Sequence, residues 1–228
     1  MKRPTVDYSE FRFSRINEPR FSHVKLLLGW VIYFALYFIT ENLIPAERCY
    51  PVHVFLDDWI PFNEFFVLFY VGWYVLVFGS LLYTFLYDVE SFQKIQIYIM
   101  ITQALAMACY ILFPSRQDLR PEVFPRENVL TALMGFIYSF DTNTGVCPSL
   151  HVAYSIGILS VFWKKPDFSA PGKWLLLIFV LGVCAAVCFV KQHSAIDVIA
   201  ALPVCLAAEC FVFGKSYWLP RLQQKKTV

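Results

Sequence analysis

Long stretches without a charged residue constrain the fold of this chain most strongly. Residues 65–87 carry no charge over 23 positions and residues 95–113 carry none over 19, and a helix that crosses a bilayer needs about 20 mainly apolar residues. Shorter apolar stretches occupy 26–40, 152–163, 174–190 and 198–213. With 58% hydrophobic and only 16% charged residues, the composition excludes a soluble globular domain.

The stretches predict an all-α integral membrane bundle of six transmembrane helices. The expected helices are 24–44, 64–87, 93–113, 149–163, 173–190 and 194–213. Residues 128–140 are apolar but too short to cross, so we expect them to lie in or dip into the interface. We expect a cytoplasmic segment at 1–23, one transmembrane domain at 24–213 and a cytoplasmic tail at 214–228. Residues 1–23 lack the apolar core and cleavage site of a signal peptide, so the first span should be an uncleaved anchor.

The basic residues are distributed unevenly between the two sides that six spans would define. Of the 19 basic residues, 14 fall on the side that holds both termini, which the positive-inside rule makes cytoplasmic. We therefore expect a multi-pass protein of the cell membrane with an active site that faces outward. The 14 residues are Lys2, Arg3, Arg12, Arg15, Arg20, Lys25, Lys94, Lys164, Lys165, Lys173, Lys215, Arg221, Lys225 and Lys226.

Two histidine motifs stand at the outer mouths of predicted spans. The first reads Cys-Pro-Ser-Leu-His and ends at His151; the second reads Lys-Gln-His-Ser-Ala-Ile-Asp and contains His193 and Asp197. The last two are four residues apart and share a helix face. A carboxylate that accepts from one imidazole nitrogen leaves the other free to attack. A purely structural His–Asp pair is the alternative, but a second histidine on the same side and nearby arginines favour a catalytic pair.

The residues around these motifs suit an anion. Arg116 and Arg120 lie among prolines in the outer loop, and a guanidinium binds phosphate oxygens through two hydrogen bonds. Ser149 is placed to begin a helix, and a helix N-terminus is itself an anion site. We therefore expect these side chains and both histidines to converge on a phosphate. For Arg48 and Arg126, contact with lipid phosphates or water is the simpler interpretation.

The order of these motifs resembles the type-2 phosphatidic acid phosphatase superfamily. Its motifs are Lys-x-x-x-x-x-x-Arg-Pro, Pro-Ser-Gly-His and Ser-Arg-x-x-x-x-x-His-x-x-x-Asp, and the resemblance covers residues 93–213. It implies that His193 attacks phosphorus to form a phosphohistidine, that Asp197 orients it and that His151 protonates the leaving group. It also implies that Arg120 and Ser149 hold the phosphate.

Three positions depart from the family pattern. Phe113 stands where the lysine is expected, with Arg116 as the nearby substitute; Val187 stands where the second arginine is expected, with Lys191 as the nearest cation. Leu150 replaces the glycine of the middle motif, and Pro-Ser-Leu-His is similar to the branch related to inositolphosphorylceramide synthases, which transfer phospho-headgroups between lipids.

The expected function is hydrolysis of a lipid phosphate or pyrophosphate monoester without metal or cofactor. The partners are then a lipid phosphate and the bilayer, with no nucleic acid and no prediction of oligomeric state. A lipid phosphotransferase would use the same residues. A proton-coupled transporter is the rival of another class, but the spans lack paired Gly/Pro interruptions and the histidines lie at helix mouths.

The seven cysteines show no metal-ligand spacing. Cys49 and Cys147 both fall on the predicted outer side, where a disulfide is chemically allowed. Nothing in the sequence fixes the distance between them, so two free thiols are the favoured interpretation.

Overall fold

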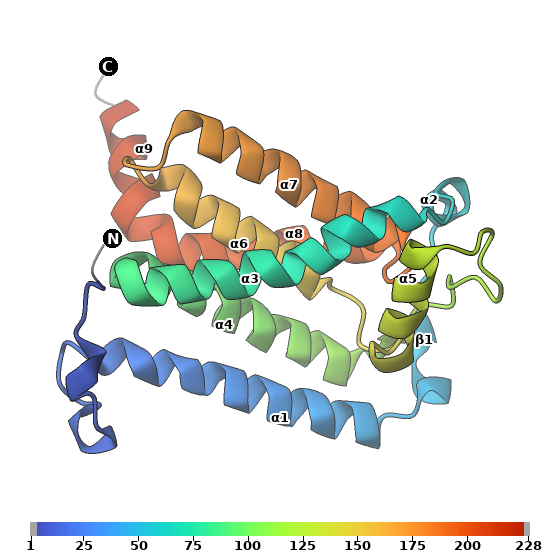
Figure 1. The fold of residues 1–228 in the computed structure, drawn as a ribbon, viewed down its shortest axis with the longest axis horizontal. Helices are drawn as coiled ribbons and strands as arrows, with labels where there is room; N and C mark the ends of the chain where they lie inside the picture. Colours follow the sequence, from blue (N-terminus) through green and yellow to red (C-terminus); the bar gives the residue numbers. More distant parts are fainter. Residues whose placement is uncertain (1–3, 226–228) are drawn as a thin grey trace.

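Six roughly parallel and antiparallel helices form the body of the computed structural model, which describes residues 4–225 (Figure 1). The all-α bundle predicted from the sequence is therefore present. The boundaries of the six helices differ from the expected ones by only a few residues. They are α1 (Leu28–Leu43), α3 (Val67–Tyr87), α4 (Val89–Leu112), α6 (Leu150–Lys164), α7 (Ala170–Phe189) and α8 (Ala195–Phe213).

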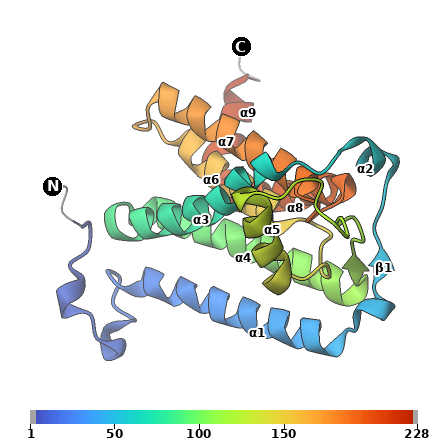
Figure 2. The same cartoon turned by 45° about the vertical axis from the view of Figure 1, so that its right-hand side comes forward.

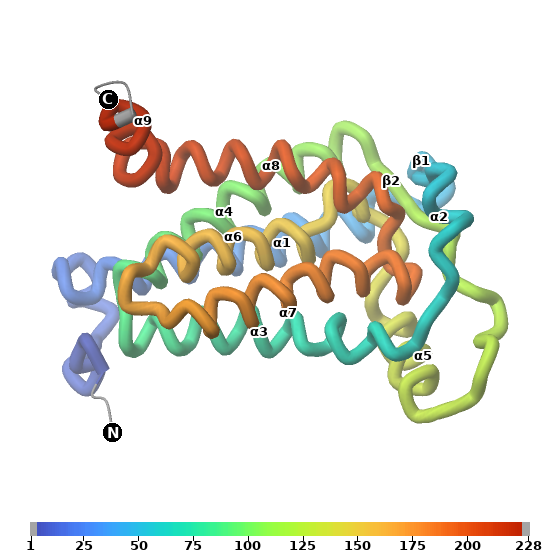
Figure 3. The backbone as a smooth tube through the Cα atoms, turned by 90° about the horizontal axis from the view of Figure 1, so that it is seen from above, coloured from blue at the N-terminus to red at the C-terminus, as the bar shows by residue number. Residues whose placement is uncertain are grey.

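Within the described residues, five continuous helical stretches are long and apolar enough to cross a membrane, which indicates a multi-pass membrane protein. The stretches are Ser22–Leu43, Glu64–Tyr87, Val89–Leu112, Ala170–Phe189 and Ala195–Gln224. Helix α6 has 15 residues and falls short of this length. It lies inside the bundle, in contact with α3, α4, α7 and α8 (Figure 3). Because protein surrounds it, α6 is not required to match the hydrocarbon thickness alone.

The two ends of the bundle differ in what they carry. Helix α1 begins and α8 ends at one end, where a short turn also joins α3 to α4 (Figure 1). The long connections lie at the other end and contain α2 (Phe55–Trp59), α5 (Val129–Phe140) and two short strands (Figure 2). The strands β1 (Tyr50–Pro51) and β2 (Ser115–Arg116) pair in parallel. This pairing ties the first long connection to the second. The apolar segment 128–140 forms the helix α5, with Asn128 as its N-cap.

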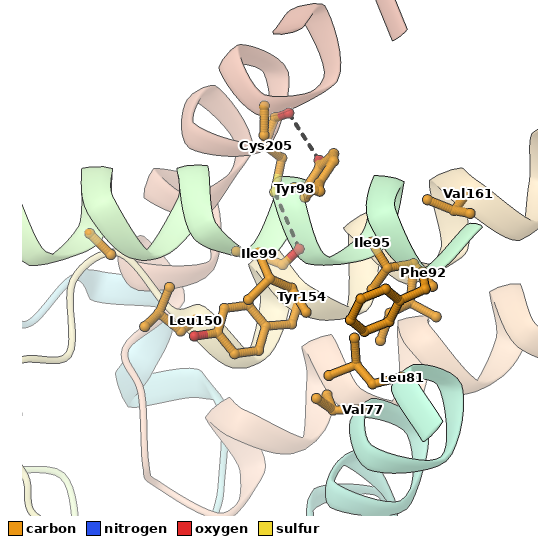
Figure 4. Packing of buried hydrophobic residues seen from close by; sticks show 14 of the residues in the cluster. Val77, Leu81, Phe92, Ile95, Tyr98, Ile99, Leu150, Tyr154, Val161 and Cys205 are labelled. Atoms are coloured by element: carbon orange, nitrogen blue, oxygen red, sulfur yellow. Dashed lines mark hydrogen bonds between the residues drawn. The ribbon is translucent and has the colours of Figure 1, made fainter. Parts of the chain in front are cut away.

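The centre of the bundle is packed where α4 and α6 cross. Figure 4 shows Ile99 of α4 beside Tyr154 of α6, while Tyr98 of α4 extends toward α8, where its hydroxyl donates to the Cys205 carbonyl at 2.9 Å. A side chain at Gly157 would meet the Tyr98 ring at 2.5 Å, so this close approach of α6 to α4 requires glycine. The packing fixes the position of the first turn of α6, which carries His151.

Both terminal segments pack onto the same end of the bundle. The backbone of Thr5 donates to Leu86 at 2.8 Å, and the Tyr8 hydroxyl donates to Phe85 at 2.8 Å. After α8 the chain continues through a π-helical turn at Gly214–Trp218 into α9 (Leu219–Lys225). The expected tail at 214–228 therefore begins as a helical continuation. Of the basic residues counted above, Lys2, Arg3 and Lys226 lie outside the described residues.

Candidate functional site

The second histidine motif forms the turn between α7 and α8 and the first turn of α8. The His193 Nδ1 lies 3.2 Å from Asp197 Oδ2, and the backbone N–H of Ser194 donates to the same oxygen at 3.0 Å. Asp197 is fully buried and His193 nearly so. With Nδ1 held by the carboxylate, Nε2 is the ring nitrogen left for chemistry. The expected i, i+4 pair is therefore present in the structure.

Lys191 adopts a left-handed backbone conformation, with φ of 54°, in this turn. The backbone N–H groups of Gln192 and His193 both donate to the Val187 carbonyl, at 3.0 and 2.9 Å. The Lys191 ammonium donates to the backbone carbonyls of Asp57, at 3.0 Å, and Ile60. Burial lowers its pKa. The structure therefore does not bring the Lys191 ammonium to the histidines as expected, because it donates to the carbonyls of Asp57 and Ile60.

Asp57 holds the start of α8 and was not predicted to do so. Its carboxylate, 4% exposed, accepts from the Ser194 hydroxyl, from Ala195 N–H at 2.8 Å and from Val54 N–H at 2.8 Å. Negative charge at a helix N-terminus is favourable. The partners are 137 and 138 positions away in the chain, so no local sequence signal could have revealed the contact.

The first histidine motif meets the second at the N-terminus of α6. Ser149 is the N-cap, as expected, and its backbone N–H donates to the Asp197 carbonyl at 3.1 Å. The rings of His151 and His193 are 5.5 Å apart between centroids and nearly perpendicular. Among the described residues, neither His151 Nε2 nor Ser149 Oγ has a hydrogen-bond partner, although both are buried. Two motifs about 40 positions apart in the sequence thus form one site.

Aromatic rings from α3 fix the orientation of His151. The Trp73 and Tyr70 rings lie 4.2 and 4.7 Å from its ring, between centroids. The Trp73 indole N–H donates to the His151 backbone carbonyl at 3.0 Å. Sequence reasoning missed both residues, because they belong to an apolar span with no polar pattern.

Arg120 reaches the histidine turn through Gln192. Its Nη2 donates to Gln192 Oε1 at 2.6 Å and to the backbone carbonyls of Asp141 and Thr142 at 2.6 and 2.9 Å. Gln192 Nε2 in turn donates to Asp141 Oδ2 at 2.8 Å. The guanidinium also lies over the Tyr138 ring, and burial lowers its pKa. Arg120 Nε is buried without a partner among the described residues.

Arg116 and Arg126 lie elsewhere. Arg116 donates to Asp118 at 3.0 Å and to the Ala46 carbonyl at 2.7 Å, so the structure does not bring it to the histidines as expected. Arg126 forms a two-point ion pair with Glu64, both at 2.7 Å. The expectation that Arg126 contacts only lipid phosphates or water therefore did not include this ion pair.

The described cysteines are free thiols, including Cys49 and Cys147, as favoured from the sequence. Burial raises the pKa of the Cys147 thiol to about 12, and the neighbouring Asp197 carboxylate adds to this shift. Cys147 is therefore not a reactive nucleophile, although it stands in the first motif.

A cavity of about 340 Å³ opens at the two histidines. Among the described residues that line it there is no lysine or arginine, and Asp141 is the one carboxylate. Within residues 4–225, no three His, Cys, Asp or Glu side chains are grouped to hold a metal ion. The lining consists of Trp30, Tyr33, Phe34, Tyr37, Tyr70, Trp73, Tyr74, Val77, Phe78, Tyr110, Phe140, Asp141, Thr142, Thr144, Gly145, Val146, Leu150, His151, Tyr154, Gln192 and His193.

Comparison of the chain with protein-family models, with curated proteins and with solved structures gives no match.

Proposed function

We propose that this chain is a membrane enzyme that removes phosphate from a lipid phosphate through a phosphohistidine on His193. The observation that carries the proposal is one arrangement of three side chains. A histidine held by a buried carboxylate faces a second histidine across the same cavity. Each residue has the chemical character that one step of phosphoryl transfer needs.

The reaction divides into two steps. In the first, His193 Nε2 attacks phosphorus, the P–O bond to the lipid alcohol breaks, and protonated His151 gives its proton to the departing oxygen. In the second, neutral His151 takes a proton from water as that water attacks the phosphohistidine, which releases inorganic phosphate. Asp197 keeps the His193 ring oriented and stabilises the positive charge that develops on it.

Polar groups around the histidines support phosphate binding. Ser149 Oγ is buried and unpartnered among the described residues, and Ser149 is the N-cap of α6, whose N-terminus carries free N–H groups and partial positive charge. Arg120 is linked to the histidine turn by Gln192. Fixed donors of this kind stabilise a transferring phosphoryl group.

We further propose that α6 completes six crossings, so that both termini are cytoplasmic and the histidines face outward. The surplus of basic residues at the end where α1 begins and α8 ends supports this orientation. The substrate then comes from the outer leaflet of the cell membrane.

The test distinguishes the roles of the two histidines by comparing how the activity of each alanine variant depends on the leaving group of the substrate. His193→Ala removes the nucleophile and should abolish hydrolysis of every substrate. His151→Ala should lose roughly 10²–10⁴-fold on a lipid phosphate, the usual value of acid–base assistance. An aryl phosphate has a good leaving group and needs little protonation, so its first step should be rescued in His151→Ala. Asp197→Asn should fall between the two.

The measurement is acid-labile, base-stable labelling of the purified protein by phosphorus-labelled aryl phosphate. Label on His193→Ala, or equal rescue of both histidine variants, would show that the roles are wrongly assigned. Inclusion of an alcohol acceptor distinguishes transfer to an alcohol from hydrolysis by the product formed.

A further inference from the structure

One wall of the cavity is built by helices outside the motif region. We call the part between α1 and α3 the aromatic groove; it is lined by Trp30, Tyr33, Phe34, Tyr37, Trp73, Tyr74, Val77 and Phe78. Helix α1 packs mainly on α4, so its aromatic residues border open space where α3 comes near. Nothing in the proposed chemistry requires a wall of this kind.

Three of the ring side chains that line the groove have their polar groups engaged by the protein. The Trp30 indole donates to Gln96 at 2.9 Å and the Trp73 indole to the His151 carbonyl at 3.0 Å. The Tyr37 hydroxyl lies 3.3 Å from the Thr142 hydroxyl. A mainly aromatic wall with no basic residue among the described lining suits an apolar ligand and offers a free phosphate no cation.

The groove follows the helices away from the histidines. From Tyr37 to Trp30 the wall extends about 10 Å at 1.5 Å per residue. One leaflet contributes half of a hydrocarbon core that is about 30 Å thick, so the wall spans a large part of the depth of one leaflet. A lipid whose phosphate lies at His193 would therefore place the upper part of one chain in the groove.

The outer rim of the groove is exposed to the bilayer. Phe34 on α1 is 56% exposed and Phe78 on α3 is 63% exposed, yet both also line the cavity. In a membrane these two side chains touch lipid hydrocarbon on one side and the cavity on the other. A chain can therefore pass between α1 and α3 without leaving an apolar environment.

We propose that the aromatic groove is the lateral entry and binding site for one hydrocarbon chain of the substrate. The inference rests on the proposed function for the position of the phosphate and adds the site and route of the chain. The lipid enters between α1 and α3 from the leaflet at the histidine end, so α1 is part of the substrate site.

The test changes the rim and compares two substrates. The variant Phe34→Gln with Phe78→Gln makes the rim polar without adding charge. The matched control is Phe38→Gln with Leu82→Gln, one turn further along the same helices. These residues are 68% and 61% exposed and do not line the cavity. The substrates are long-chain phosphatidic acid and a water-soluble aryl phosphate.

We expect the rim variant to lose about tenfold or more in kcat/KM for phosphatidic acid, because apolar contact area is lost. Its hydrolysis of the aryl phosphate should match wild type, and the control variant should keep both activities. An equal loss on both substrates, or no loss on either, would overturn the groove as a chain site.

A binding measurement keeps the inference testable even if the wild-type protein hydrolyses neither substrate, which would refute the proposed function. Benzoylphenylalanine placed at Phe34 should form a saturable crosslink to radiolabelled phosphatidic acid in detergent, and the same group at Phe38 should not. Equal, unsaturable crosslinking at both positions would mean general contact with lipid and would refute the site.

Discussion

Replacement of Asp57 by alanine should disable the site without touching either histidine. The Asp57 carboxylate is buried and accepts from Ser194 Oγ and from the backbone N–H groups of Ala195 and Val54. Ser194 and Ala195 directly follow His193. The carboxylate therefore fixes the point where the turn that carries His193 enters α8.

The size of the effect follows from the contacts. Loss of the carboxylate leaves the Ser194 hydroxyl and the Ala195 N–H buried without an acceptor, and each unsatisfied group costs about 1–3 kcal/mol. The variant should therefore lose about 2–6 kcal/mol of stability. A displacement of His193 by about 1 Å should lower kcat roughly 10²-fold, while KM changes little.

The assay pairs thermal unfolding in detergent with aryl phosphate hydrolysis. Asp58→Ala is the matched control, because the neighbouring carboxylate is exposed and contacts only His53 among the described residues; we expect it to behave as wild type. Asp57→Asn keeps one acceptor oxygen, so its kcat should lie between those of Asp57→Ala and wild type. If folded Asp57→Ala turns over like wild type, the argument that this carboxylate positions His193 is refuted.

Two further outcomes are expected. In a background without native cysteines, the proposed outward orientation of the histidine end predicts that a membrane-impermeant thiol reagent labels Val123→Cys from outside and misses Asp167→Cys; the reverse pattern would place the site in the cytoplasm. Activity should survive a metal chelator and be inhibited by vanadate, an oxyanion that resembles the transition state when bound to histidine; loss in chelator with recovery on adding metal would contradict the mechanism.

The predictable features were those set by local patterns. Uncharged runs located the helices, because length and hydropathy alone decide whether a segment can cross a bilayer. The pairing of His193 with Asp197 followed from their spacing of four residues on one helix. The short α6 is the instructive case, since its 15 residues give a weak signal of a span and its place inside the bundle depends on packing against other helices.

The unpredicted features depend on contacts between distant segments. Lys191 stands beside the motif, but its ammonium is occupied by carbonyls 134 and 131 positions away. Arg116 was chosen as a substitute for a missing lysine, but β-pairing with the first long connection places it near Ala46. A basic residue in the right stretch of sequence is therefore insufficient evidence for a phosphate contact.

Several buried polar atoms without a partner among the described residues lie in the segments that carry the motifs. The buried charged residues Asp57, Glu64 and Lys191 are engaged by protein partners, whereas the amide nitrogens of Gln103 and Gln117, outside the motifs, are also unpartnered among the described residues.

Within the set selected by the motifs, the polar atoms Ser149 Oγ, His151 Nε2, Arg120 Nε and Asp197 Oδ1 have no partner among the described residues. Buried polar atoms of native proteins are nearly always hydrogen-bonded, and each exception costs about 1–3 kcal/mol. Ser149 Oγ and Arg120 Nε are unpaired donors in the segments that carry the motifs, and a site for an oxyanion requires such donors.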